Sequence, residues 1–265
     1  MNFTAVHPNG TVDAELAAAI AKLKTDDHGA GAVNAAAAPP AVFDVTRYGA
    51  RPCHEDHHGG GLQCQSSTAA FRAATMLAAK AAATGQRAEV LVPGPGTFTT
   101  GPFNISTRTT LTIEADAVVK GSTDVAEYTI IAPLPSYGSA RDGSPPGCPK
   151  DGCHTRFQAL VMVPPGSTDV ILNGSGTLDG SGAFFWAERD HLKAGRPHLI
   201  EIHGATRVEV GGLTLLDSAF WTLHPVYSKD VHIHDLNISA PAPSPNTDGI
   251  DPGAAALLVS LFALC

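Results

Sequence analysis

The chain has 265 residues, 43% of them hydrophobic and 16% charged, with 27 glycines and 20 prolines. This composition excludes a disordered or coiled-coil chain and is typical of a globular protein with many turns. The formal net charge of −8 argues against nucleic acid as the main partner, because binding to its phosphates depends on lysine and arginine. No apolar stretch reaches the roughly 20 residues that a membrane span needs, so no membrane partner is expected.

The segment 1–40 stands apart in composition. It is rich in alanine, ends in Ala38-Pro39-Pro40 and shows no sustained hydrophobic period. Such a segment is typical of a linker, a propeptide or a doubtful translation, and we exclude it from the predicted fold. The main domain is expected at 41–252, and an aberrant apolar tail at 253–265.

The predicted domain opens with one strand and one helix. Val42-Phe43-Asp44-Val45 alternates apolar and polar side chains, which predicts a strand. From Ser66 to Ala83 apolar residues recur at helical spacing, and Ser66 or Ser67 is a suitable N-cap, so this segment predicts an amphipathic helix. No second helix is predicted.

Short strands follow the helix. Apolar runs between glycine, asparagine and proline predict strands at Glu89–Val92, Thr109–Glu114, Leu160–Val163, Val170–Leu172, Leu199–His203 and Val208–Val210. The segment Arg207–Leu215 also resembles the later segment Asp230–Ile238. A repeat made of two short strands predicts one coil of an all-β solenoid, whose open N-terminal end the helix would cover. An antiparallel sandwich is the alternative.

The five cysteines form two close pairs and one single residue. Cys53 lies near Cys64, Cys148 lies near Cys153, and both pairs fall in loops rich in glycine, proline or histidine. We predict two disulfide bridges and an unpaired Cys265. Five reduced thiols in a cytosolic protein are the alternative, and a zinc site is disfavoured because no Cys-x-x-Cys pair exists.

Evidence on secretion is mixed. Residues Met1–Gly10 lack the basic and apolar regions of a signal peptide. Glycosylation triplets of the type Asn-x-Ser/Thr begin at Asn2, Asn9, Asn104, Asn173 and Asn237. Such triplets also arise by chance, so they and the cysteine pairs support an extracellular location only weakly.

The segment Ser244–Pro252 carries the strongest chemical signal. It reads Ser-Pro-Asn-Thr-Asp-Gly-Ile-Asp-Pro and places Asp248 and Asp251 close together around a glycine. These are also common turn residues, so a plain loop is the alternative.

The order Asn246-Thr247-Asp248-Gly249-Ile250-Asp251 resembles the Asn-Thr-Asp motif of glycoside hydrolase family 28, the polygalacturonases. The resemblance extends from about residue 42 to 252. It includes the segments Leu134–Gly138, Gly174–Gly180, Arg196–Ile200 and Ser218–Tyr227, and the opening strand with Tyr48-Gly49-Ala50. The motifs occur in the order that the family has them, which makes chance similarity an unsatisfactory explanation.

The resemblance implies a right-handed parallel β-helix that hydrolyses α-1,4-galacturonan, the polysaccharide of pectin, with inversion. Asp248 matches the first of three catalytic aspartates. In the family this residue and one member of a later Asp-Asp pair activate water, and the other member protonates the leaving oxygen. No cofactor is expected, and pectic polysaccharide is the expected partner.

The sequence departs from the family pattern after Pro252. The later Asp-Asp pair, a Gly-His-Gly and an Arg-x-Lys do not follow, and Asp26-Asp27 lies in the excluded N-terminal segment. We therefore expect a β-helix without its C-terminal coils, lacking the proton donor and inactive by itself. The complete protein is expected to be a monomer and this shorter chain to be prone to association.

Other residues near the motif have two possible roles. Asn246 and Asp251 are expected to support Asp248 within the turn. Trp221 is a candidate for stacking on a sugar, although an aromatic residue beside Phe220 is more often part of a core. His224 is a weak candidate for binding, since it would face the cleft.

A histidine pair lies on the strand that precedes the motif. His232 and His234 alternate and so share a face, as two metal ligands would. No third ligand is evident, and we interpret the pair, like His54, His57 and His58, as solvated polar side chains, so no metal site is expected.

Three functions compete. The first is an inverting galacturonan hydrolase, and the second is a non-catalytic pectin-binding or misfolding fragment. An in-frame Asp-Asp about one coil after Pro252 would favour the first. A calcium-dependent lyase would need clustered acidic ligands and a basic proton abstractor, neither of which we find.

Overall fold

The structure is a computed structural model that describes residues 39–55, 62–135, 155–255 and 257–260. The predicted N-terminal segment therefore lies outside the described residues, except for Pro39 and Pro40. Cys148, Cys153 and Cys265 lie outside them as well. From Pro40 onward the chain makes up one unit.

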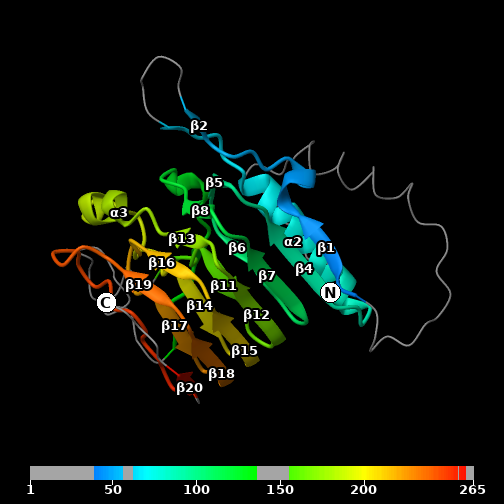
Figure 1. The fold of residues 1–265 in the computed structure, drawn as a ribbon. Helices are drawn as coiled ribbons and strands as arrows, with labels where there is room; N and C mark the ends of the chain where they lie inside the picture. Colours follow the sequence, from blue (N-terminus) through cyan, green and yellow to red (C-terminus); the bar gives the residue numbers. More distant parts are fainter. Residues whose placement is uncertain (1–38, 56–61, 136–154, 256, 261–265) are drawn as a thin grey trace. The chain divides into compact units, whose positions relative to one another are not determined.

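Three parallel sheets make up most of this unit (Figure 1). Successive strands of each sheet come from successive coils of the chain, as in a β-solenoid. The first sheet has seven strands, in the order β1 (Ala41–Asp44), β4 (Ala88–Val92), β7 (Thr109–Ile113), β12 (Thr168–Gly174), β15 (Thr206–Gly211), β18 (Lys229–His234) and β20 (Leu257–Ser260).

Each coil then passes through two further sheets. The five-stranded sheet contains β5 (Gly96–Thr100), β8 (Ala117–Gly121), β13 (Thr177–Asp179), β16 (Thr214–Leu216) and β19 (Asn237–Ser239). The four-stranded sheet contains β6 (Phe103–Asn104), β11 (Val161–Val163), β14 (Ile200–His203) and β17 (Leu223–Val226). All pairings within the three sheets are parallel, so the all-β solenoid prediction is confirmed and the antiparallel sandwich is wrong.

The register confirms the internal repeat. Val208 pairs with Val231 on adjacent strands of the seven-stranded sheet, and these residues occupy equivalent places in the two similar segments. Leu215 pairs with Ile238 in the five-stranded sheet with the same offset along the chain. One coil of the chain is therefore one repeat at this point.

Rows of apolar side chains fill the interior. In the seven-stranded sheet Val90, Leu111, Leu172, Val210 and Ile233 are consecutive partners across five strands, and each is at most 1% exposed. Burying one such side chain stabilises the fold by about 1.5–3 kcal/mol. Because each coil covers the row of the previous coil, the two ends of the stack need other cover.

Helix α2 (Thr68–Ala83) lies against β1 and β4 at the first coil (Figure 1). Phe71 on its buried face packs 5.1 Å from the ring of Phe103 on the first strand of the four-stranded sheet. The predicted capping helix is thus confirmed. Its N-cap is Ser67, which makes no capping bond with its side chain, while the Thr68 N–H donates to Ser66 Oγ at 3.3 Å.

The prediction of a single helix is wrong. The described part of the chain has a second α-helix, α3 (Gly182–Glu188), after β13, and two short 3₁₀ helices at Val45–Tyr48 (η1) and Val125–Glu127 (η2). In α3, Phe185 is fully buried against Tyr128, at a ring distance of 5.4 Å. A helix of this length is too short to show a helical period in the sequence. Its formation therefore depends on tertiary packing.

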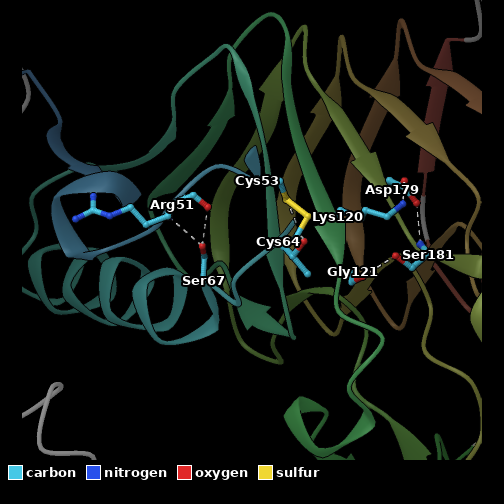
Figure 2. The surroundings of a disulfide bond; sticks show 9 residues. Arg51, Cys53, Cys64, Ser67, Lys120, Gly121, Asp179 and Ser181 are labelled. Carbon is cyan, nitrogen blue, oxygen red and sulfur yellow. Dashed lines mark hydrogen bonds and ion pairs between the residues drawn. A yellow bond between two sulfur atoms is a disulfide. The ribbon is translucent and has the colours of Figure 1, made fainter. Parts of the chain in front are cut away.

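Among the described residues, two antiparallel strand pairs lie outside the three parallel sheets. One joins β9 (Ile130–Ile131) to β10 (Arg156–Phe157), and the other joins β2 (His54–Glu55) to β3 (Leu62–Gln63). A disulfide bond links Cys53 to Cys64 beside the second pair (Figure 2), which confirms the first predicted bridge. The second, Cys148–Cys153, stays a prediction.

The Gly174–Gly180 segment is structural. Gly174 has a left-handed backbone with φ 125°, and a Cβ atom there would lie 2.0 Å from the Ile113 carbonyl oxygen. A Cβ atom on Gly180 would lie 2.6 Å from the Asp217 carbonyl oxygen. Asp179 between them pairs with Lys120 and accepts a bond from the Ser181 N–H (Figure 2). Glycines here permit adjacent coils to approach each other.

Candidate active site

Residues 248–251 of the aspartate motif extend the four-stranded sheet by one parallel segment beside β17, which we call the aspartate rung. Leu223 of β17 forms a parallel bridge to Ile250, and the Asp251 N–H donates to the Leu223 carbonyl at 2.9 Å. Ile250 packs against the core. The apolar residue of the motif therefore points inward, and the adjacent Asp251 follows the outer face of the sheet.

Asp248 lies at the entry to this rung. Its backbone carbonyl accepts a hydrogen bond from the Thr222 N–H at 2.9 Å, and the residue is exposed. The carboxylate is thus presented to solvent from a backbone that is tied to the preceding coil. An exposed carboxylate in this position can accept a proton from a water molecule.

Asp251 is half-buried, and its environment disfavours ionisation. Burial, followed by the nearby charge of Asp248, raises the pKa of Asp251 to about 6. Its Oδ2 atom is buried and has no hydrogen-bond partner among the described residues. A protonated carboxyl group suits such a site better than a carboxylate.

His224 holds the motif from the preceding coil. Its ring is fully buried, and Nδ1 lies 2.6 Å from the Asp251 carbonyl oxygen, so Nδ1 carries the proton that it donates. Burial, followed by the neighbouring His198, lowers the pKa of His224 to about 4, which keeps the ring neutral. The expectation that His224 faces the cleft does not fit a residue with 0% exposure.

Aromatic rings surround His224. Trp221 is partly exposed and lies 5.0 Å from both Phe220 and His224, measured between ring centroids. His198 stacks on Trp221 at 5.4 Å with an interplanar angle of 11°. One part of Trp221 packs on rings and another part is open to solvent, so its contact with a sugar stays a prediction.

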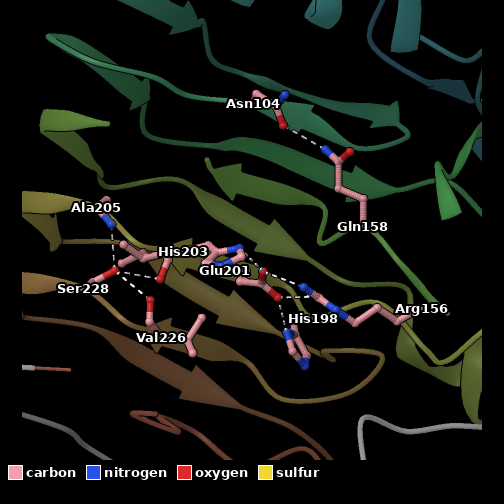
Figure 3. A network of polar contacts seen from close by, with 10 residues as sticks. Asn104, Arg156, Gln158, His198, Glu201, His203, Ala205, Val226 and Ser228 are labelled. Atoms are coloured by element: carbon pink, nitrogen blue, oxygen red, sulfur yellow. Dashed lines mark hydrogen bonds and ion pairs between the residues drawn. The ribbon is translucent and has the colours of Figure 1, made fainter. Parts of the chain in front are cut away.

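A buried ionic network lies one strand earlier on the same face (Figure 3). Glu201 is the register partner of His224, and it accepts hydrogen bonds from both terminal nitrogens of Arg156. His198 Nδ1 lies 2.9 Å from the same carboxylate. Burial would raise the pKa of Glu201, but the bonds and charges of His198 and Arg156 outweigh it and lower the value to about 2.

Arg196 contacts the motif directly. Its guanidinium donates to the Pro245 carbonyl at 2.9 Å and to Asn246 Oδ1 at 2.7 Å. Burial, followed by the charge of Arg189, lowers the pKa of Arg196 to about 10, which still leaves it charged at neutral pH. Asn246 is therefore a structural partner of Arg196 within the turn.

The structure brings most of the predicted site residues together. Asp248, Asp251, Asn246, His224 and Trp221 lie on the motif rung or on the coil before it. Sequence reasoning missed three buried charged residues, Arg156, Arg196 and Glu201. Arg196 lies in the segment Arg196–Ile200, which resembles family 28. The only sign in the sequence that its side chain is buried is the position of a charged residue beside an apolar stretch.

The histidine pair lies elsewhere. His232 and His234 are on β18 of the seven-stranded sheet, with ring centroids 4.6 Å apart. His234 lies 2.8 Å from Asp235 and 3.3 Å from Glu209. Among the described residues no group of three acidic, histidine or cysteine side chains is arranged to hold a metal ion. No helix in the described part of the chain is long and apolar enough to cross a membrane.

The coils and the aspartate rung place the chain among the parallel β-helix proteins. The model of the family described as "Glycosyl hydrolases family 28" matches residues 85–259. The chain therefore belongs to glycoside hydrolase family 28, as the motif predicted.

Individual relatives agree with this assignment. A "Probable polygalacturonase" of Vitis vinifera is 36% identical over 80% of this chain and 42% of its own length. An "Exopolygalacturonase" of Zea mays is 29% identical over 88% of this chain and 47% of its own length. The chain thus spans about half the length of the curated relatives it matches.

A solved structure supports the fold. The family 28 exopolygalacturonase of Yersinia enterocolitica superposes with a TM-score of 0.63, at 18% identity, over 84% of this chain and 42% of that one. At this identity the similarity concerns the fold, which is a right-handed parallel β-helix.

Proposed function

We propose that this chain forms part of an inverting hydrolase of α-1,4-galacturonan, in which Asp248 helps to activate the attacking water. The observation that carries the proposal is the aspartate rung. It presents the Asp248 carboxylate to solvent on a β-helix of family 28, from a backbone fixed by the preceding coil.

Inversion requires a second carboxyl group at some distance. An inverting glycosidase places its acid and base about 6.5–9.5 Å apart, so that a water molecule fits beside the sugar. Strands of a parallel sheet are about 4.8 Å apart, so side chains on the next coils after Asp248 are suitably spaced. The second and third aspartates of the proposed mechanism would come from such coils.

Asp251 does not replace the missing acid. It is on the same rung as Asp248, and its Oδ2 is buried, so it cannot reach the far side of a bound glycosidic bond. We assign it to the support of the turn. Trp221, which is partly exposed beside the rung, is the better candidate for contact with a sugar ring.

The extracellular location is part of the same proposal. Cys53–Cys64 is a disulfide bond, and such bonds persist mainly in oxidising compartments. A polysaccharide substrate outside the cell agrees with this. We propose that the complete protein acts as a secreted monomer.

The test compares the 265-residue chain with a version extended at its C-terminus to the length of the curated relatives. Reducing ends released from polygalacturonate measure cleavage. We expect the extended chain to cleave polygalacturonate. Its Asp248→Asn variant should cleave about 10²- to 10⁴-fold more slowly, which is the factor that a general acid or base contributes.

The short chain by itself should show no measurable cleavage, since it holds only Asp248 of the three aspartates. Glu209→Gln in the extended chain, a carboxylate change on the seven-stranded sheet, serves as the matched control and should cleave normally. Equal rates for the short and extended chains, or full activity of Asp248→Asn, would contradict the proposal. Binding without cleavage by the extended chain would favour the non-catalytic alternative.

A further inference from the structure

Arg196 connects two successive coils at the edge of the aspartate rung. It is 6% exposed, and it lies in the segment between α3 and β14. One terminal nitrogen donates to the Ala219 carbonyl at 2.7 Å and to the Pro245 carbonyl at 2.9 Å. The other donates to Asn246 Oδ1 at 2.7 Å.

The guanidinium group also lies on an aromatic ring. Its central carbon is 4.8 Å from the centroid of Phe220, which is itself buried. A planar fork with several donors can satisfy three acceptors and stack at once, and an ammonium group cannot. The geometry is therefore specific for arginine.

The acceptors lie on either side of the gap between coils. Ala219 and Phe220 belong to the turn that precedes β17, and Pro245 and Asn246 belong to the turn that precedes the aspartate rung. Arg196 thus fixes the later turn relative to the earlier one.

Asn246 has an uncommon backbone conformation. Its φ of 58° is in the left-handed region, which asparagine tolerates better than most residues but which still carries a cost. The bond from Arg196 to its side chain stabilises the residue in this conformation. Asp248 follows soon after in the chain, so the direction of its carboxylate depends on the path of the backbone through Asn246.

A second anchor holds the other side of Asp248. His224 donates to the carbonyl of Asp251, which follows Asp248 on the same rung. Asp248 therefore lies between two fixed points, and it remains exposed itself.

From this geometry we infer that Arg196 is a positioning residue for Asp248, acting through Asn246 and Pro245. The inference rests on the proposed role of Asp248. Arg196 itself contacts none of the reacting groups. Its loss should let the turn move, and a displacement of about 1 Å at a catalytic group can cost roughly 10² in rate.

The first experiment measures order and needs no activity. Hydrogen exchange is followed by mass spectrometry in the 265-residue chain, for wild type, Arg196→Met, Arg196→Lys and Asn246→Ala. We expect faster exchange in peptides covering 244–251 for all three variants and unchanged exchange in peptides covering β7 and β12. Arg207→Met, which removes a guanidinium group that binds Asp169 on the seven-stranded sheet, should leave 244–251 unchanged.

The second experiment measures catalysis in the extended chain. Arg196→Met should lower kcat by about 10- to 100-fold with KM changed less than about threefold, because the fault lies in the placement of Asp248 and not in sugar binding. Asn246→Ala should show the same pattern. The double variant should be no slower than the slower single variant, because both substitutions remove the same hydrogen bond between Arg196 and Asn246.

Two results would overturn the inference. One is unchanged exchange of 244–251 in both Arg196→Met and Asn246→Ala, and the other is an active extended chain whose kcat is unaffected by Arg196→Met. If Arg196→Met does not fold, Arg196→Lys and Asn246→Ala decide in its place. If the extended wild type does not cleave at all, the proposed function fails, while hydrogen exchange still decides whether Arg196 orders the turn.

Discussion

Charged side chains on the outer faces of the seven-stranded and four-stranded sheets differ in their exposure to solvent. On the seven-stranded sheet Glu209 is 45% exposed and meets His234, and Asp169 pairs with Arg207 in solvent. On the four-stranded sheet Glu201 is 0% exposed and meets Arg156 and His198, which are both buried. Both glutamates occupy outward positions of strands in the same coil region, yet one is solvated and the other is enclosed.

The enclosed charges lie on the face of the proposed site, and the solvated charges lie on a face without proposed site residues. A buried charge network costs desolvation energy and is sensitive to the loss of any member. We therefore expect substitutions in this network to cost more stability than substitutions on the outer face of the seven-stranded sheet. The predictions below test this contrast.

The largest effect on stability is expected from Glu201→Gln. It leaves the Arg156 guanidinium buried without its counter-charge, and breaking a buried pair typically costs about 3–5 kcal/mol. Urea unfolding followed by circular dichroism should show this loss in the free energy of unfolding.

Glu209→Gln is the matched control. It changes the same side chain on the exposed face and should cost less than about 1 kcal/mol, as exposed pairs do. Similar losses for the two variants would show that the enclosed network has no special role.

The next effect is expected from the double variant Cys53→Ser, Cys64→Ser. The bond closes a loop with a sequence separation of 11, and its removal should cost about 2–3 kcal/mol through the entropy of the unfolded chain. The free energy of unfolding, measured without reductant, gives the loss. Reduced wild type should match the variant, and a variant as stable as oxidised wild type would contradict the expectation.

The sequence predicted the coils well because their signal is local. Alternation in β4 and β7 and the repeat that pairs β15 with β18 both follow from stacking that each coil shares with its neighbours. In the five-stranded sheet, the repeat predicted β16, whereas β13 was not predicted, since a strand of three residues carries too little pattern. The tail at 253–265 contributes β20, which continues the seven-stranded sheet.

The candidate site was predicted only in part. Asp248 was found through its motif, and the structure shows it exposed on a rung. The supports of that rung are long-range contacts: Arg196 reaches Asn246 across a sequence separation of 50, and Arg156 reaches Glu201 across one of 45. No periodicity encodes such contacts, so they emerge only when the coils are stacked.

A smaller effect is expected from Asp251→Asn and depends on pH. Because burial raises the folded-state pKa of Asp251 above its unfolded value, its contribution to stability is present below about pH 4 and is lost as pH rises through about 6. Asparagine removes this dependence. The variant should therefore gain stability relative to wild type between about pH 4 and 7, by on the order of 1 kcal/mol after solvent screening.

Urea unfolding at several pH values measures that difference. The lowered pKa of His224 makes the folded protein less stable as pH falls, which is the opposite trend. Because His224 is present in both proteins, this effect largely cancels in the comparison. A difference between Asp251→Asn and wild type that does not change with pH would contradict the expected protonation of Asp251.

The smallest effect is expected from His234→Gln on the seven-stranded sheet. Hydrogen bonding to Asp235, opposed by some burial and helped by Glu209, raises the pKa of His234. A raised histidine pKa gives stability that is present below the unfolded value near about 6.5 and is lost as pH rises through the folded value. The variant should thus lose less than about 1 kcal/mol at pH 5.5 and nothing measurable at pH 8.5.

Added salt provides a second measurement. Because the pairs of His234 with Asp235 and Glu209 are exposed, about 0.5 M salt should reduce even the loss at pH 5.5, whereas the loss caused by Glu201→Gln should persist in salt. A loss for His234→Gln that is large, or equal at both pH values, would show that the two faces do not differ as we describe.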